Sequence, residues 1–252
     1  MILKSVAITL FGLIIGSCLS ICIYRIPIGK AIVDPPSYCM SCGKRLRFYD
    51  LIPVVSYLLQ KGRCRYCTNR IPVKYPIVEI ITAILFMVLY YRYALTIDFL
   101  AYAYLLSILV VVFFIDLEHK IIPDKLVIAG LIGGILIAVY NIFIPVSLYG
   151  DRHWWNPFLG GITGSGFLLL IVISGYIIYK SGKAMGMGDV KIFIPIGLFL
   201  GWKLTTVALI ISFASAGVFS IYVIICRRNK MEDNVPFGPF IALGTLVSLV
   251  WG

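Results

Sequence analysis

Long runs of apolar residues, separated by short polar segments, most limit how this chain can fold. A run of about 20 residues is long enough for a helix to cross a bilayer, and in lipid a helix satisfies its own backbone hydrogen bonds. The runs lie at residues 2–23, 76–92, 97–115, 125–144, 158–179, 190–201, 204–226 and 237–251. Because 61% of the chain is hydrophobic, we predict an all-α polytopic membrane protein with about eight transmembrane helices in the lipid bilayer.

The basic residues predict how these helices are oriented. If the first run begins outside the cytoplasm, Lys4, Arg92, Arg152 and Lys203 are the outer basic residues, and the other 18 of the 22 lie inside. Cytoplasmic loops of membrane proteins carry this excess of Lys and Arg, so the bias explains the net charge of +11 without a nucleic-acid partner. A cleaved lipoprotein signal ending near Cys18 is the alternative for the first run, but positive charge follows that run rather than preceding it.

The polar loop at residues 24–75 carries four cysteines in two Cys-x-x-Cys pairs. Cys39 and Cys42 recur as Cys64 and Cys67, 25 positions later. Two similar cysteine pairs that face one ion can form a tetrahedral zinc site without an open ligand position, which is structural rather than catalytic. Two disulfides are the alternative, but the loop is predicted to be cytoplasmic, where disulfides are rare. We therefore predict a zinc-ribbon-like loop.

Two aspartates at the edges of apolar runs are the candidate catalytic groups. Asp116 ends one run, and Asp189 follows Gly186 and Gly188 at the start of another. Ionisable residues at membrane depth are costly and usually functional. We predict that the two acids meet, share a proton and activate water, as in aspartic proteases. The glycines would make room for an extended substrate, and Lys191 would orient the site or contact the substrate.

Other interpretations of the acids remain open at this point. They could cap helices or pair with Lys120 and Lys191, and Asp124 is a rival for the first acid. A transporter could use two such acids to relay protons or bind a cation. A membrane-anchored zinc adaptor without chemistry is a third possibility, in which the cysteines matter and the aspartates do not.

Several motifs resemble one known family along nearly the whole chain. They are Gly16-Ser17, Tyr24-Arg25-Ile26-Pro27, the cysteine loop with Tyr49-Asp50-Leu51-Ile52-Pro53, Ile115-Asp116, Ile122-Pro123-Asp124, Gly186-Met187-Gly188-Asp189-Val190-Lys191 and Pro236-Phe237-Gly238-Pro239-Phe240. On these residues the chain resembles the bacterial type IV prepilin peptidases, also called prepilin leader peptidase/N-methyltransferases, of the Gly-x-Gly-Asp membrane aspartyl protease class.

The resemblance implies roles for the two acids and for the cysteine loop. It implies that Asp116 and Asp189 are catalytic and that the four loop cysteines bind zinc. It implies removal of a basic leader from prepilin or pseudopilin substrates at the cytoplasmic face of the bacterial inner membrane. It further implies N-methylation of the new amino terminus with S-adenosylmethionine. The corresponding domains are a first transmembrane helix at 1–23, a methyltransferase-associated zinc loop at 24–75 and a peptidase domain at 76–252.

Overall fold

The computed structural model describes residues 2–34, 36–144, 149, 153–179, 186–227 and 235–251. These residues form helices and loops, and they contain two isolated β-bridges but no strand. The chain divides into two compact units, Met1–Ala94 and Leu95–Gly252. The functional domains predicted at 1–23, 24–75 and 76–252 stay a prediction. Arg152, one of the four basic residues predicted to lie outside the cytoplasm, falls outside the described residues.

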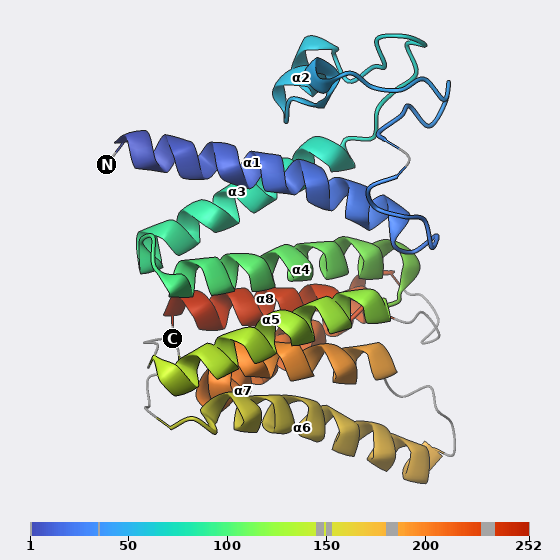
Figure 1. The fold of residues 1–252 in the computed structure, drawn as a ribbon. Coiled ribbons are helices and arrows are strands. Elements are labelled where there is room, and N and C mark those ends of the chain that lie inside the picture. The colour runs from blue at the N-terminus through green and yellow to red at the C-terminus, as the bar shows by residue number, and fades with distance from the viewer. Residues whose placement is uncertain are drawn as a thin grey trace. The chain divides into compact units, whose positions relative to one another are not determined.

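The first unit consists of two long helices and the loop between them (Figure 1). Its elements are α1 (Ile2–Arg25), η1 (Phe48–Leu51), α2 (Val55–Leu59) and α3 (Lys74–Tyr93). The long helices pack closely because α1 presents glycines to α3. A Cβ atom on Gly12 would lie 2.7 Å from the Cα atom of Ala83, and one on Gly16 would lie 2.6 Å from that of Glu79. Small residues allow this backbone approach between apolar helices.

The second unit is a bundle in which α7 contacts α5, α6 and α8, and α4 packs beside α8 (Figure 1). Its elements are α4 (Ile97–His119), α5 (Asp124–Phe143), α6 (Asn156–Tyr179), α7 (Met187–Arg227) and α8 (Gly238–Trp251). Glycines again set the spacing. The backbones of Gly160 and Gly197 meet where α6 crosses α7, and Gly130 of α5 packs on Pro195. These contacts fix the first half of α7.

The predicted membrane helices are confirmed. Six of the described helices are long and apolar enough to cross a membrane, and α8 is a shorter apolar helix. Two predicted runs, 190–201 and 204–226, lie together in α7 and are separated by Gly201, whose φ of 69° and ψ of 173° are not helical. Glycine adopts positive φ without steric cost, so α7 consists of two helical segments.

The junction inside α7 is held by a side chain of α6. The Trp202 N–H donates to the Asn156 Oδ1 atom at 3.1 Å, and the Asn156 Nδ2 atom donates to the Tyr149 carbonyl at 3.1 Å. The first N–H groups of a helix have no partner within it, so the buried Asn156 side chain satisfies one of them. The chain can thereby change direction inside the apolar bundle without leaving that amide unsatisfied.

Candidate functional site

Asp116 lies in the last turn of α4 and is held by the start of α8. Its side chain is buried, and the residue is 5% exposed. The Gly238 N–H donates to the Asp116 Oδ2 atom at 2.7 Å. Gly238 is the first residue of α8, and helix N-termini have free N–H groups and a partial positive charge that favour carboxylates. A Cβ atom on Gly238 would lie 3.0 Å from that of Asp116, so a glycine permits this contact.

Asp189 lies in the first turn of α7 and is also buried, with 9% of the residue exposed. Its N–H donates to the Gly186 carbonyl at 3.1 Å. The charge of Asp116 acts on the Asp189 carboxyl group, and Lys120 in turn acts on Asp116. The two predicted acids are 73 positions apart in the sequence (189 − 116 = 73). The structure nevertheless brings them within electrostatic range of each other.

The predicted supporting residues occupy different surroundings. A Cβ atom on Gly186 would lie 3.2 Å from the Asp189 Oδ2 atom, and one on Gly188 would lie 3.0 Å from the Ile122 Cβ atom. Gly188 thus lets the connection that follows α4 approach the start of α7. That these glycines make room for a substrate stays a prediction.

Lys191 forms an ion pair that sequence reasoning had not assigned to it. Its Nζ atom lies 2.8 Å from the Asp124 Oδ1 atom at the start of α5. The two side chains are 46% and 67% exposed, and exposed pairs of this kind contribute at most about 1 kcal/mol. Asp124, the rival for the first acid, is therefore the partner of Lys191. The predicted role of Lys191 at the site stays a prediction.

The four loop cysteines form a cluster that fits one metal ion. The Sγ atoms of Cys39, Cys42, Cys64 and Cys67 all lie within 4.8 Å of one another, and those of Cys39 and Cys67 are 3.8 Å apart. Four sulfurs at about 2.3 Å from a tetrahedral zinc ion are separated by roughly 3.8 Å. All four residues are free cysteines rather than disulfides, so the donor set suits a soft divalent metal.

Each cysteine pair sits on a turn, and the second turn repeats the first. The Cys39 N–H donates to the Lys44 carbonyl, and 25 positions later the Cys64 N–H donates to the Asn69 carbonyl. The β-bridges Tyr38–Arg45 and Arg63–Arg70 and the turn bonds Gly43 N–Cys39 O and Thr68 N–Cys64 O show the same offset. The repeat seen in the sequence is thus a repeat of structure, and we call the two turns knuckles.

The first knuckle favours the thiolate form of its first cysteine. Burial acts to raise the pKa of the Cys39 thiol, but hydrogen bonds from the backbone of Cys42 and Ser41 and from the neighbouring thiols outweigh it. The pKa of Cys39 is lowered to about 6. In the same cluster the backbone of Asn69 acts to lower the pKa of the Cys67 thiol, but burial and hydrogen bonds with the other three cysteines raise it to about 12. The thiolate, which is the form that binds metals, is therefore favoured at Cys39 and not at Cys67.

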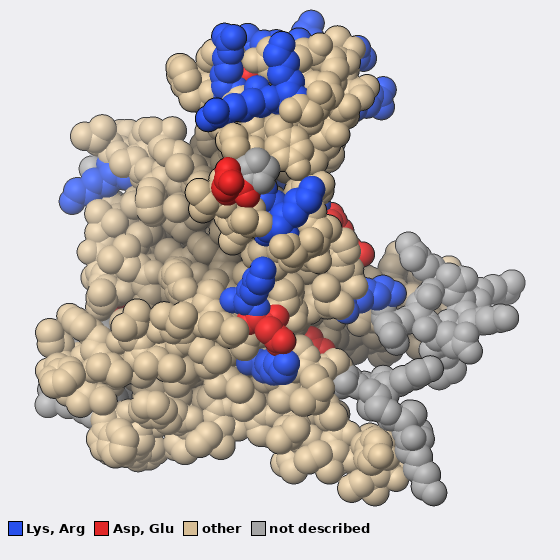
Figure 2. Space-filling view, turned by 45° about the vertical axis from the view of Figure 1, so that its right-hand side comes forward, with Lys and Arg blue, Asp and Glu red and all other residues tan. Residues whose placement is uncertain are grey.

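The charged surface of the first unit belongs mainly to the cysteine loop. Figure 2 shows Lys and Arg side chains gathered on this segment, whereas the visible sides of the helices carry mostly uncharged side chains. The basic residues of 24–75 are Arg25, Lys30, Lys44, Arg45, Arg47, Lys61, Arg63, Arg65, Arg70 and Lys74. This segment has the charge expected of a loop on the cytoplasmic side.

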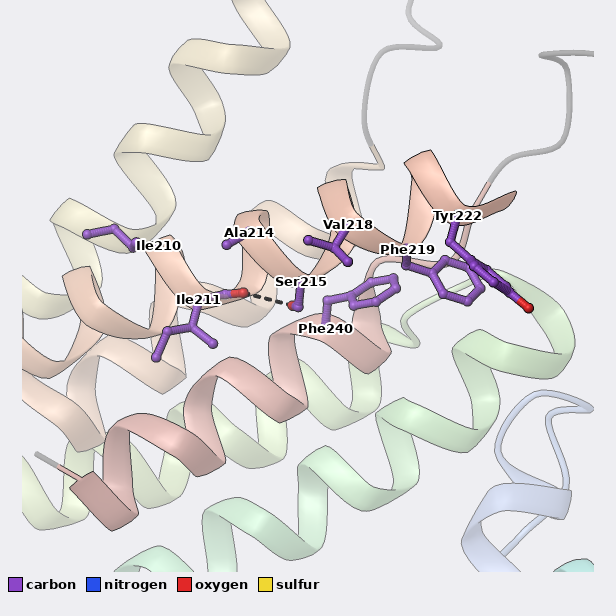
Figure 3. A pocket seen from close by; sticks show the side chains of 8 residues that line it. All are labelled: Ile210, Ile211, Ala214, Ser215, Val218, Phe219, Tyr222 and Phe240. Carbon is purple, nitrogen blue, oxygen red and sulfur yellow. Dashed lines mark hydrogen bonds between the residues drawn. The ribbon is translucent and has the colours of Figure 1, made fainter. Parts of the chain in front are cut away.

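An apolar groove of about 670 Å³ lies on the second unit, between the later part of α7 and Phe240 of α8 (Figure 3). Its hydroxyl groups belong to Ser215 and Tyr222. The Ser215 hydroxyl donates to the backbone carbonyl of Ile211, one turn earlier. The groove therefore has the chemistry of a surface that lipid chains cover.

Comparisons with known proteins identify the family. Residues 10–93 match the family model of the bacterial peptidase A24 N-terminal domain, and residues 103–221 match that of the type IV leader peptidase family. No solved structure matches the chain.

The chain also resembles curated proteins named prepilin leader peptidase/N-methyltransferase. It is 31% identical to that of Aeromonas salmonicida (strain A449), over 96% of this chain and 89% of that protein. It is 31% identical to that of Bacillus subtilis (strain 168), over 96% and 92%, and 29% identical to that of Pseudomonas putida, over 97% and 89%. The chain therefore belongs to the type IV leader peptidase family.

Proposed function

We propose that this protein is a membrane aspartic endopeptidase that removes the basic leader from type IV prepilins or pseudopilins and N-methylates the new N-terminal residue. Its family membership and the names of its relatives support both activities. The observation that carries the peptidase activity is the presence of two buried carboxyl groups, Asp116 at the end of α4 and Asp189 at the start of α7.

Two such acids can hydrolyse a peptide bond with water alone. One carboxylate takes a proton from water, whose oxygen attacks the carbonyl carbon of the scissile bond, while the other carboxylic acid donates a proton to the carbonyl oxygen. When the tetrahedral intermediate breaks down, the leaving nitrogen takes up a proton. The Gly238 N–H, which donates to Asp116, would keep that carboxyl group in one orientation during the reaction.

The proposed location of the reaction is the cytoplasmic face of the bacterial inner membrane. The predicted orientation supports it, since Asp116 lies at the end of α4 and Asp189 at the start of α7, both on the basic side. The basic leader of the substrate would stay in the cytoplasm while its apolar segment lies among the membrane helices. The scissile bond would then reach the acids at the membrane boundary.

The cysteine loop would hold one structural zinc ion and support methylation. Cys39, Cys42, Cys64 and Cys67 supply four sulfurs, so no position is left for a substrate or water, and the ion would stabilise a loop that has little core of its own. S-adenosylmethionine, when bound, supplies a methyl group on a positively charged sulfonium.

The test is the processing of a co-expressed, tagged prepilin by variants of the two acids. Asp116→Asn and Asp189→Asn should each lower the rate of leader removal roughly a thousandfold or more, as expected for a group that acts in the chemical step. Glu118→Gln is the matched control, since this exposed residue also lies in the last turns of α4, and it should process normally. Mass spectrometry of the prepilin reports the cleavage site and the terminal methyl group together. Normal cleavage by both Asp variants would refute the peptidase assignment and favour a transporter or adaptor.

A further inference from the structure

A cavity of about 200 Å³ lies within the first unit, between α1, α3 and the cysteine loop. The helices contribute Ser17 and Ser20 from α1 and Glu79 from α3. Cys39 and Cys64, one from each knuckle, also line the cavity. The metal cluster thus forms part of its wall. No feature of the sequence pointed to this cavity, because its residues come from three separate segments.

Glu79 brings a carboxyl group to the wall of the cavity. The residue is only 8% exposed. Its Oε2 atom accepts the Val54 N–H at 2.7 Å, and the Ser17 side chain also donates to its carboxylate. Both donors are uncharged. Since burying a carboxylate is costly unless its charge is met, this position suits a ligand that carries a positive charge.

Three other charged side chains line the cavity, namely Arg25, Asp50 and Arg70. The Asp50 Oδ1 atom lies 3.1 Å from the Arg65 Nε atom. The Arg25 Nη1 atom donates to the backbone carbonyls of Ala31 and Ile32. The hydrogen bonds that Glu79 accepts come from uncharged groups, whereas Asp50 is paired with the cation of Arg65.

Aromatic rings line the same cavity. They belong to Tyr24, Tyr38, Tyr57 and Tyr75. The faces of aromatic rings attract cations, most strongly where water is excluded. A carboxylate together with several tyrosines favours a cation that is only weakly hydrated, and a sulfonium is such a cation.

We infer that this cavity binds the sulfonium end of the methyl donor, with Glu79 as the group that attracts its positive charge. The inference rests on the proposed methyltransferase activity and gives it a place in the molecule. Loss of the methyl group converts the sulfonium into a neutral thioether, which Glu79 no longer attracts. In this assignment, Glu79 makes the cavity bind the charged donor more tightly than its uncharged product. Because Cys39 and Cys64 line the cavity, the metal would support donor binding without touching the donor.

The test compares donor and product binding in one variant. Glu79→Gln keeps an oxygen that can accept the Val54 N–H but removes the charge. We expect its affinity for S-adenosylmethionine to fall about tenfold or more, as for the loss of a charged partner. Its affinity for S-adenosylhomocysteine should stay within about twofold, since a neutral ligand gains little from the carboxylate. Both affinities are measured by isothermal titration calorimetry on the purified, zinc-loaded full-length protein, with Glu118→Gln as the control that changes neither.

The outcomes separate this inference from the proposed function. If Glu79→Gln binds the donor as tightly as the unchanged protein, or loses donor and product equally, the assignment of Glu79 is overturned. Photocrosslinking of radiolabelled donor to the unchanged protein gives a second measurement that needs no variant. Label on peptides from residues 17–25 or 75–79 supports the inference, and label only in the second unit overturns it. Failure of the proposed function itself would give a different result: the protein without any substitution would leave cleaved prepilin unmethylated.

Discussion

Gly238 is the residue near the acids that sequence reasoning did not assign to the site. In the sequence it stands only within Pro236-Phe237-Gly238-Pro239-Phe240, a motif to which the resemblance gives no role. Its N–H meets Asp116 across 122 positions of sequence, and no local pattern reports a contact of that separation. The acids themselves could be predicted because each is a charge at the edge of an apolar run, which is visible along the chain.

Gly238→Ala tests whether this contact matters for cleavage. The added Cβ atom would lie 2.9 Å from the Asp116 Oδ2 atom and 3.0 Å from its Cβ atom, so α8 or the carboxyl group must shift. We expect leader removal to slow about tenfold to a hundredfold, because small displacements of catalytic groups are costly. Gly217→Ala is the matched control in the same unit, since a Cβ atom there meets nothing within 4 Å. Cleavage rates of a purified prepilin measure both, and equal rates would show that the Gly238 contact is dispensable.

Among the elements, the two knuckles were predicted and the short helices between them were not. The 25-residue offset of the cysteines marks both knuckles in the sequence, whereas η1 and α2, with four and five residues, are too short to show a helical period of apolar residues. The first helix also runs to Arg25 rather than ending at residue 23. The Arg25 side chain donates to carbonyls of the segment that follows, a tertiary contact that hydropathy does not indicate.

Gly43→Ala tests the backbone of the first knuckle. Gly43 has a φ of 69°, and a Cβ atom there would meet nothing within 4 Å, so the substitution adds backbone strain without a clash. A left-handed conformation costs an L-residue roughly 1–2 kcal/mol. We therefore expect zinc release to a chelator to become about fivefold to thirtyfold faster, measured with a colorimetric zinc indicator.

Thr68→Gly is the counterpart of that substitution in the second knuckle. Thr68 already has a φ of 59° at the position that corresponds to Gly43. Replacing it by glycine removes a strained conformation, so this variant should release zinc no faster than the unchanged protein. If Gly43→Ala retains zinc as long as the unchanged protein, strain in the knuckle does not limit metal binding.

For the whole molecule, the number and position of the membrane helices followed from the sequence because lipid imposes one requirement on all of them. Each helix must be apolar and must satisfy its own backbone hydrogen bonds. Each can therefore be recognised from its own stretch of the sequence. The packing of the runs did not follow in the same way. The hydrogen bonds of Asn156 with Tyr149 and Trp202 depend on segments that meet only after folding. The position of Glu79 at the cavity depends on such segments too.

The predicted orientation of the whole chain can be tested with alkaline phosphatase fusions, which are active only outside the cytoplasm. A fusion after Ile144, at the end of α5, should be active, and one after Lys120, at the end of α4, should be inactive. The physical reason is the retention of basic segments on the cytoplasmic side. Immunoblots control for the amount of each fusion, and the reverse pattern of activity would place the acids on the outer face.

The hydrogen bond between Gly238 and Asp116 also offers a way to watch inhibitors bind. An amide that donates to a buried carboxylate exchanges its proton with solvent slowly. A compound whose hydroxyl group binds Asp116 must share or displace that donor, which changes the deuterium uptake of the peptide that begins α8. Hydrogen–deuterium exchange at this one amide would therefore distinguish compounds that engage the acids from those that merely partition into the surrounding lipid.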